Sequence, residues 1–232
     1  GPLTAQEIER RRIDRAARDA ATVAEEARKE RGYRTAAELS KNLIDACSRE
    51  THYYLNSKGF PDALGLVAEG VLVVPMRSLE TNQLQGAQTI EWLPEPRAWE
   101  KKMVFGMRAK GAVLRLGSPR AKEIILAEGY ATSLSLEMAV QRMRLSISIM
   151  CCFSAQNMKH VASKLSGKIG IFADNDESKT GEKVAIETGL PFVMANEIGF
   201  DANDIHAKYG LMTLMSKIME LRKIMAFNQG QK

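Results

Sequence analysis

The sequence has few cysteines, no paired-cysteine motif and no nucleotide-binding glycine loop, and each absence excludes a class of protein. Cys47 stands alone and Cys151 and Cys152 are adjacent, so no Cys-x-x-Cys pair is available for a zinc ribbon in this chain. The three histidines are scattered without metal-ligand spacing. A Gly-x-x-x-x-Gly-Lys-Ser/Thr loop is also missing, which excludes a Walker-type ATPase or helicase motor.

Long apolar segments are missing too. The longest runs, Val71–Met76 and Ile147–Phe153, fall well short of the ~20 residues that cross a bilayer. The N-terminus is polar and arginine-rich without an apolar signal core, so we expect a cytoplasmic protein with no membrane partner. Gly1-Pro2 resembles the pair that a protease leaves after cleavage, which suggests a fragment of a longer protein.

The chain does have an uneven distribution of charge over its 232 residues, with a net charge of +5. Residues 1–122 hold 21 Lys and Arg against 16 Asp and Glu, whereas residues 123–232 hold 12 of each. Residues 101–122 contain seven basic residues and no acidic one. A solvated surface explains a basic excess by itself, but the complete absence of acids favours binding of nucleic acid or nucleoside triphosphates.

Hydrophobic periodicity predicts helices first and strands afterwards. A helix over residues 4–31 is expected to end at Gly32, and a second one over Thr35–Cys47 to begin with a threonine cap and Glu38 at capping-box spacing. A short helix ending in glycine is expected near residues 51–59. Four strands, expected to form a small antiparallel sheet, come next: residues 71–77, 84–91, 102–107 and 112–116.

Beyond residue 122 the pattern alternates strictly between strands and helices. Strands are predicted at residues 123–127, 146–152, 168–173 and 191–194, and helices near residues 131–142, 155–165 and 179–189. This alternation predicts an α/β fold with a parallel sheet flanked by helices, joined to a mixed α+β basic part. A methionine-rich helix over residues 211–227 is expected to serve packing.

Acidic residues follow two of the predicted parallel strands. Glu128 comes after one strand, and Asp174 and Asp176 come after another. Because the carboxyl ends of parallel strands share one rim, the three carboxylates are expected to converge there and to bind Mg²⁺. The alternative is a helix cap for the aspartates and a helix-dipole partner for Glu128. We favour the metal site, since three structural roles would otherwise have to coincide.

Longer strings carry a resemblance to a known family. Ala127–Ser135 includes Glu-Gly, Ala173–Asp176 includes Asp-x-Asp, and Ser154–Ala162 lies between them. In a strand–helix series these strings resemble the Toprim domain of bacterial-type primases, topoisomerases and some nucleases, and look like the Toprim primases of plasmids and bacteriophages. Tyr54–Gly59 and the Val74–Gln88 hairpin look like the region that precedes Toprim there. The resemblance covers about residues 35–210.

The resemblance implies roles for the acidic residues. Asp174 and Asp176 would hold Mg²⁺ or Mn²⁺, and Glu128 would share the metal or act as general base toward the attacking hydroxyl. Asp201 and Asp204 resemble an acidic stretch that follows the fourth strand in these primases. They would support the metal ligands, and capping the next helix is an equal alternative.

Phosphate-binding residues are expected on both sides of residue 123. Four basic residues at motif positions or strand ends are expected to hold the template strand and nucleotides, with solvated surface as the alternative at each: Lys58, Arg77, Lys102 and Lys110. Asn157 and Lys159 begin a helix, where an amide and an ammonium reach phosphate. Their alternative is a helix cap and a solvated lysine.

Four segments are therefore predicted. They are a charged helical extension at residues 1–34, a basic N-terminal subdomain at residues 35–122, a Toprim metal-binding domain at residues 123–205 and a C-terminal helical segment at residues 206–232. The favoured function is the catalytic core of a DNA primase, which synthesises short RNA primers from nucleoside triphosphates on single-stranded DNA with Mg²⁺ or Mn²⁺.

A zinc-binding module, and also a helicase, is expected outside this fragment. Two alternatives stay open. A Toprim-type nuclease would use the same carboxylates to hydrolyse phosphodiester bonds, and a non-catalytic module would bind nucleotide or DNA without chemistry. A topoisomerase is disfavoured, because its nucleophilic tyrosine belongs to a separate large domain that this length cannot accommodate.

Overall fold

A computed structural model describes residues 4–229 of the chain, and the Gly1-Pro2 pair lies outside the described residues. The first elements are α1 (Ala5–Asp45), β1 (Ser48–Thr51), α2 (Tyr53–Ser57), β2 (Leu64–Ala68), β3 (Val71–Ser78), β4 (Leu84–Leu93), β5 (Ala98–Met103) and β6 (Ala112–Leu116). They are followed by β7 (Glu123–Ala127), α3 (Tyr130–Arg142), β8 (Ile147–Cys151), α4 (Ala155–Lys164), β9 (Lys168–Ala173), α5 (Thr180–Thr188), β10 (Phe192–Met194), α6 (Ala202–Tyr209) and α7 (Leu211–Gln229). Each helix within residues 4–229 is either too short or too polar to span a lipid bilayer.

The N-terminal helix α1 is one unbroken element, so the predicted break at Gly32 is wrong. Its real cap is Thr4, which forms a capping box with Glu7. Thr35, predicted as a second cap, instead donates its hydroxyl to the Arg31 carbonyl inside the helix. Strong helix formers on both sides outweigh the cost of about 1 kcal/mol for a single interior glycine.

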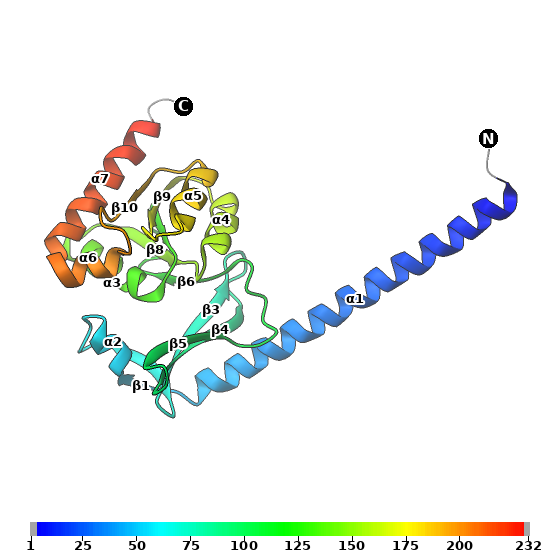
Figure 1. Ribbon diagram of the computed structural model, residues 1–232, viewed down its shortest axis with the longest axis horizontal. Coiled ribbons are helices and arrows are strands. Elements are labelled where there is room, and N and C mark those ends of the chain that lie inside the picture. The colour runs from blue at the N-terminus through cyan, green and yellow to red at the C-terminus, as the bar shows by residue number, and fades with distance from the viewer. Residues whose placement is uncertain (1–3, 230–232) are drawn as a thin grey trace.

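Only the C-terminal part of α1 packs against the rest of the protein. Ala36 and Ser40 are its buried residues, and they lie where α1 crosses β3 and β4. The preceding turns project away from the body as a rod (Figure 1). The long exposed part therefore depends on its own hydrogen bonds and on side-chain pairs along the helix.

All ten strands belong to one sheet, in the order β1-β2-β3-β6-β8-β7-β9-β10, with β4 and β5 branching from β3. Strands β7, β8, β9 and β10 pair in parallel, as the alternating pattern predicted. The strands before them pair antiparallel. The predicted α/β class, with a parallel core and flanking helices, is confirmed.

Three strands of the N-terminal half differ from expectation. Strands β1 and β2 were not predicted, although Glu69-Gly70, with φ of 50° and 77°, is the tight turn that joins β2 to β3. Strand β5 was predicted at residues 102–107 but lies at Ala98–Met103. It is an edge strand, because it pairs with β4 alone. Charged residues are typical of edge strands, and they interrupt the apolar alternation from which strands were predicted.

Helices cover both faces of the parallel strands (Figure 1). One buried cluster joins α3, α6 and α7 to β7, β8 and β9, and a second joins α4 and α5 to the opposite face. An ion pair fixes α7, because Arg222 Nε lies 2.8 Å from Glu123 Oε2 at the start of β7. Lys168 also contacts Glu123, and these cations lower the pKa of that carboxyl to about 2.

The continuity of α1 can be tested at Gly32. A Cβ there meets no atom within 4 Å, so Gly32→Ala should add helix propensity of about 0.5–1 kcal/mol and raise helix content in far-ultraviolet circular dichroism. The matched control is Gly59→Ala, because Gly59 has φ of 90° and the change should destabilise the protein. A loss of helix content in Gly32→Ala would mean that a helix ends there.

Candidate metal and nucleotide site

Two acidic residues follow neighbouring parallel strands and line one pocket. Strand β7 pairs with β9 through registers such as Leu126 with Ile171, so the carboxyl ends of both strands lie side by side. Glu128 follows β7 and Asp174 follows β9, and both line a pocket of about 230 Å³ together with Asp201. The two carboxylates converge because parallel strands bring the residues after their carboxyl ends to one rim of the sheet.

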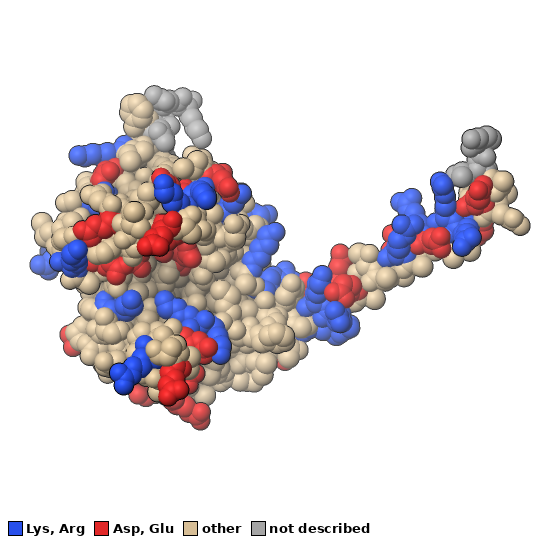
Figure 2. All heavy atoms as spheres, in the orientation of Figure 1, with Lys and Arg blue, Asp and Glu red and all other residues tan. Residues whose placement is uncertain are grey.

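The opposite wall of this pocket comes from the N-terminal half of the chain. Lys58 follows α2, Gln88 lies on β4 and Lys101 lies on β5, and all three line the pocket. Figure 2 shows a hollow between the two halves of the body, with acidic side chains gathered on its upper side and basic ones on its lower side. The pocket is therefore bordered by carboxylates on one side and by ammonium groups on the other.

The charged form of Asp174 is destabilised by burial and by neighbouring carboxylates. Burial, followed by the charges of Asp201, Glu128 and Asp176, raises its pKa to about 7. Its Oδ1 is buried and has no hydrogen-bond partner in the part of the chain that the structure describes. The pKa of Glu128 is raised as well, first by burial and then by the charge of Asp176. A nearby cation would relieve the repulsion at both carboxylates at once.

The residues present fit a magnesium-like cation held by few protein ligands. Within residues 4–229 no group of three or more His, Cys, Asp or Glu side chains is arranged as a complete metal site. Mg²⁺ usually takes one or two carboxylates and fills its other positions with water and phosphate oxygens. Asp174, through its unpaired oxygen, and Glu128 are the residues that would hold such an ion.

Asp176 lies in the loop after β9 and is engaged with α5. Its Oδ1 accepts hydrogen bonds from the Thr180 amide at 3.0 Å and from the Ser178 hydroxyl at 2.6 Å. Its Oδ2 accepts one from the Gly181 amide at 3.3 Å, and these bonds lower its pKa. Asp176 does not line the pocket; its side chain binds the first-turn amides of α5, whose N-cap residue is Lys179, and its charge still acts on Glu128 and Asp174.

Gly181 allows the first turn of α5 to approach Asp174. A Cβ at this position would lie 2.5 Å from the Asp174 carbonyl oxygen and 3.2 Å from its amide nitrogen. Backbone atoms cannot give way as the end of a side chain can, so a larger residue would displace either α5 or Asp174. This glycine is a positioning residue for the site.

The acidic pair after β10 forms a helix cap. Asp201 and Asp204 make a capping box at the start of α6, in which the Asp201 side chain accepts from the Asp204 amide at 2.9 Å. The other oxygen of Asp201 accepts a hydrogen bond from the Thr132 hydroxyl at 2.8 Å. Asp201 thus caps α6 and lines the pocket. Asp204 does not line it, but its negative charge helps to raise the pKa of Asp174.

Asn157 connects the two halves of the sheet. Its side-chain oxygen accepts from the Gly111 amide at 2.7 Å, and its nitrogen donates to the carbonyls of Ala112 and Cys152, each at 2.8 Å. The side chain is buried and its amide is occupied, which argues against a contact with phosphate. Lys159, the other residue expected there, pairs with Glu187 at 2.6 Å and ties α4 to α5.

The structure separates the four basic residues that were expected to act together. Lys58 lines the carboxylate pocket. Lys102 lies on β5 and pairs with Glu100 at 2.8 Å. Arg77 lies on β3 and donates to the Asn82 carbonyl at 3.2 Å, and Lys110 lines two clefts next to α4. Of the four, only Lys58 shares the pocket with the carboxylates.

Sequence reasoning missed several groups in the pocket wall. Lys101 was noted only as part of the basic run, because β5 was expected to begin one residue after it. Gln88 was noted only as part of a resembling hairpin. Phe153 was missed as well, and its φ of 65° is unusual for a bulky residue and sets the chain direction between β8 and α4 at the pocket.

Comparison with known proteins covers the part of the chain that carries the carboxylates. Residues 123–210 match the family model described as Toprim domain, a region that begins with β7, ends just after α6 and covers less than half of the 232 residues. A search of curated proteins found no match. The match supports a Toprim-containing protein, and such domains occur in primases, nucleases and topoisomerases.

The burial of Asp174 predicts a pH-dependent effect of Asp174→Asn. The folded-state pKa lies above the unfolded one, so the native protein binds a proton that the unfolded chain releases, and wild-type stability falls as pH rises from about 4 to about 7. Without divalent cations the variant should equal wild type near pH 4 and be more stable by about 2–4 kcal/mol at pH 8.

Urea unfolding across this pH range measures the difference. Asp62→Asn, which changes an exposed aspartate outside the pocket, is the control and should show no such trend. A wild-type protein whose stability is flat between pH 4 and pH 8 would contradict the charge repulsion around Asp174.

The connecting role of Asn157 predicts a large loss of stability in Asn157→Ala. The change leaves the Gly111 amide and two carbonyls without their partner, so unfolding free energy should fall by about 2–4 kcal/mol in urea titrations. Gln156→Ala, at the exposed neighbouring position on α4, should change it by less than about 0.5 kcal/mol. Equal stability of the two variants would show that the three bonds contribute little.

Proposed function

We propose that this chain is the catalytic core of a DNA primase, which joins nucleoside triphosphates into a short RNA primer on a single-stranded DNA template. The observation that carries the proposal is the pocket with two unlike walls, in which Glu128 and Asp174 face Lys58 and Lys101. A triphosphate with its divalent cation carries both signs of charge and suits such a pair of walls. The Toprim match over residues 123–210 supports the same class of chemistry.

The residues of the two walls have separable tasks in this proposal. Asp174 and Glu128 hold the cation, and Lys58 and Lys101 bind phosphate oxygens. A bound Mg²⁺ or Mn²⁺ would neutralise phosphate charge and lower the pKa of the attacking hydroxyl. Glu128 accepts the proton of that hydroxyl, a task that its raised pKa suits, because a carboxylate with a raised pKa is a stronger base.

Tyr130 in the pocket wall has no catalytic task in this proposal. Tyr130 lines the pocket, but burial raises its pKa to about 12, so the phenol stays protonated and is a poor nucleophile. Lys101, which lines the same pocket, exerts its field on Glu128 and on Cys151. Lys58 and Lys101 line this pocket and are the residues proposed to bind phosphate.

A primer-synthesis assay tests the proposal. Wild-type protein, single-stranded DNA, Mg²⁺ and labelled nucleoside triphosphates should yield short labelled RNA, and Asp174→Asn should lower the rate by at least about 100-fold while Asp62→Asn leaves it unchanged. Incubation of labelled DNA or RNA with Mg²⁺ alone separates the alternatives. Shortening of the strand would identify a nuclease, and nucleotide binding without any product would identify a binding module.

The role of Glu128 predicts a distinct result for Glu128→Gln. The amide keeps the size and one oxygen acceptor but cannot take a proton, so primer synthesis should fall by about 10²–10⁴-fold while nucleotide affinity is retained. A titration with Mg²⁺ and Mn²⁺ discriminates between the two tasks. Recovery of the rate at high metal concentration would show that Glu128 acts chiefly as a metal ligand.

A further inference from the structure

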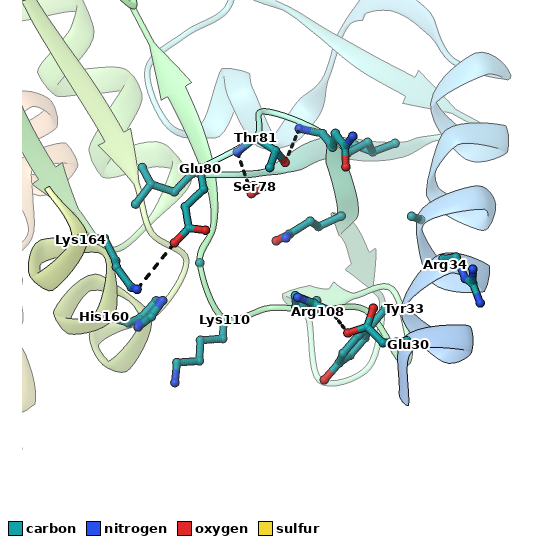
Figure 3. A pocket seen from close by; sticks show the side chains of 16 residues that line it. Glu30, Tyr33, Arg34, Ser78, Glu80, Thr81, Arg108, Lys110, His160 and Lys164 are labelled. Carbon is teal, nitrogen blue, oxygen red and sulfur yellow. Dashed lines mark hydrogen bonds and ion pairs between the residues drawn. The ribbon is translucent and has the colours of Figure 1, made fainter. Parts of the chain in front are cut away.

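A second cavity lies between α4 and α1 and is lined by residues of both helices. It has a volume of about 740 Å³. Figure 3 shows Tyr33 and Arg34 on α1 along one side of it, His160 and Lys164 on α4 along the other, and the loop with Lys110 between them. Ser78, the last residue of β3, and Thr81, in the turn before β4, border it at the top of this view.

This cavity continues along α4 toward the carboxylate pocket. A neighbouring cleft of about 590 Å³ shares Lys110 and His160 with it, so the two form one groove, here called the α1–α4 groove. The cleft also includes Ser154, which directly follows Phe153 in the wall of the carboxylate pocket. The groove therefore begins beside the carboxylate pocket and ends against α1.

The groove carries an excess of positive charge. Five cationic residues line it: Arg34, Arg108, Lys110, Lys159 and Lys164. Its two acidic residues, Glu30 and Glu80, are already paired with Arg108 and Lys164. Arg34 and Lys110 form no ion pair with any residue between 4 and 229, so at least two cations remain for an external anion.

The charges of Lys110 and Lys164 both act on His160, which lines the same groove. Burial, and then the charges of these two lysines, lowers the pKa of His160 between them. His160 is thus one more residue of the groove at which a positive potential acts. The long shape of the groove spreads this potential along a path instead of concentrating it at one point.

We propose that the α1–α4 groove holds the single-stranded template of the proposed function, which passes from the carboxylate pocket along α4 to α1. A positively charged groove combined with an aromatic side chain is the usual arrangement for single strands, because cations follow the backbone and rings stack on bases. Phe105 does not line the groove itself, but it is 98% exposed on the loop that carries Arg108 and Lys110, where its ring is free to stack on a base of the bound strand. A duplex offers no unstacked base to it.

The test measures binding of a labelled oligothymidylate by the full chain without nucleoside triphosphates, at several salt concentrations. Arg34→Ala combined with Lys110→Ala removes two phosphate contacts, so the slope of log affinity against log salt should become shallower by about 1.4, at roughly 0.7 per contact. Lys122→Ala combined with Lys223→Ala is the matched control, because both lysines are exposed and lie outside the groove.

Phe105→Ala tests the stacking contact separately. It should weaken oligothymidylate binding by about five- to hundred-fold with an unchanged salt slope, since stacking is worth roughly 1–3 kcal/mol per base. Affinity for a duplex of the same length should be insensitive to this change. Circular dichroism of each variant checks that the fold is retained.

Three results would overturn the inference: a groove variant with the slope of its control, equal losses for single strand and duplex, or a Phe105→Ala variant with full affinity. The inference relies on the proposed function for the identity of the bound polymer, but its test needs no catalysis. A chain that binds the strand in the groove and never synthesises a primer would overturn the proposed function alone.

Discussion

The site depends on keeping the Asp174 carboxylate half-buried beside other carboxylates, and much of the surrounding structure serves that constraint. The parallel pairing of β7 with β9 brings Glu128 next to it, and the capping box of α6 brings Asp201. Gly181 lets the first turn of α5 close over the Asp174 backbone. Two packed helical layers hold these strand ends in place against the repulsion that, together with burial, raises the pKa of Asp174 to about 7.

The second half of the site comes from the antiparallel strands, and one strand connects both. Strand β6 pairs with β3 through Val113 and with β8 through Leu114 to Leu116. Asn157 reinforces this junction from α4. The lysine wall on α2 and β5 therefore has a fixed relation to the carboxylate wall, which allows ligands with both signs of charge to be recognised by side chains that are far apart in sequence.

Sequence reasoning succeeded where periodicity determines the backbone and failed where tertiary contacts decide. Glu128 and Asp174 were placed together because parallel strands share a rim. For Asp176 the helix-cap alternative describes the side chain, which accepts a hydrogen bond from the Thr180 amide four residues along the chain. Lys101 was not singled out because an edge strand rich in charge gives no apolar alternation. The break expected at Gly32 shows the limit of a local rule, since its neighbours on both sides continue the helix.

The single continuous sheet has a mechanical consequence for the pocket. Moving the carboxylate wall away from the lysine wall would require breaking the main-chain hydrogen bonds of β6 and the three bonds of Asn157 together. The pocket of about 230 Å³ thus lies between two walls that one continuous sheet holds together. A ligand of this pocket must therefore fit the spacing of the two walls as the sheet sets it.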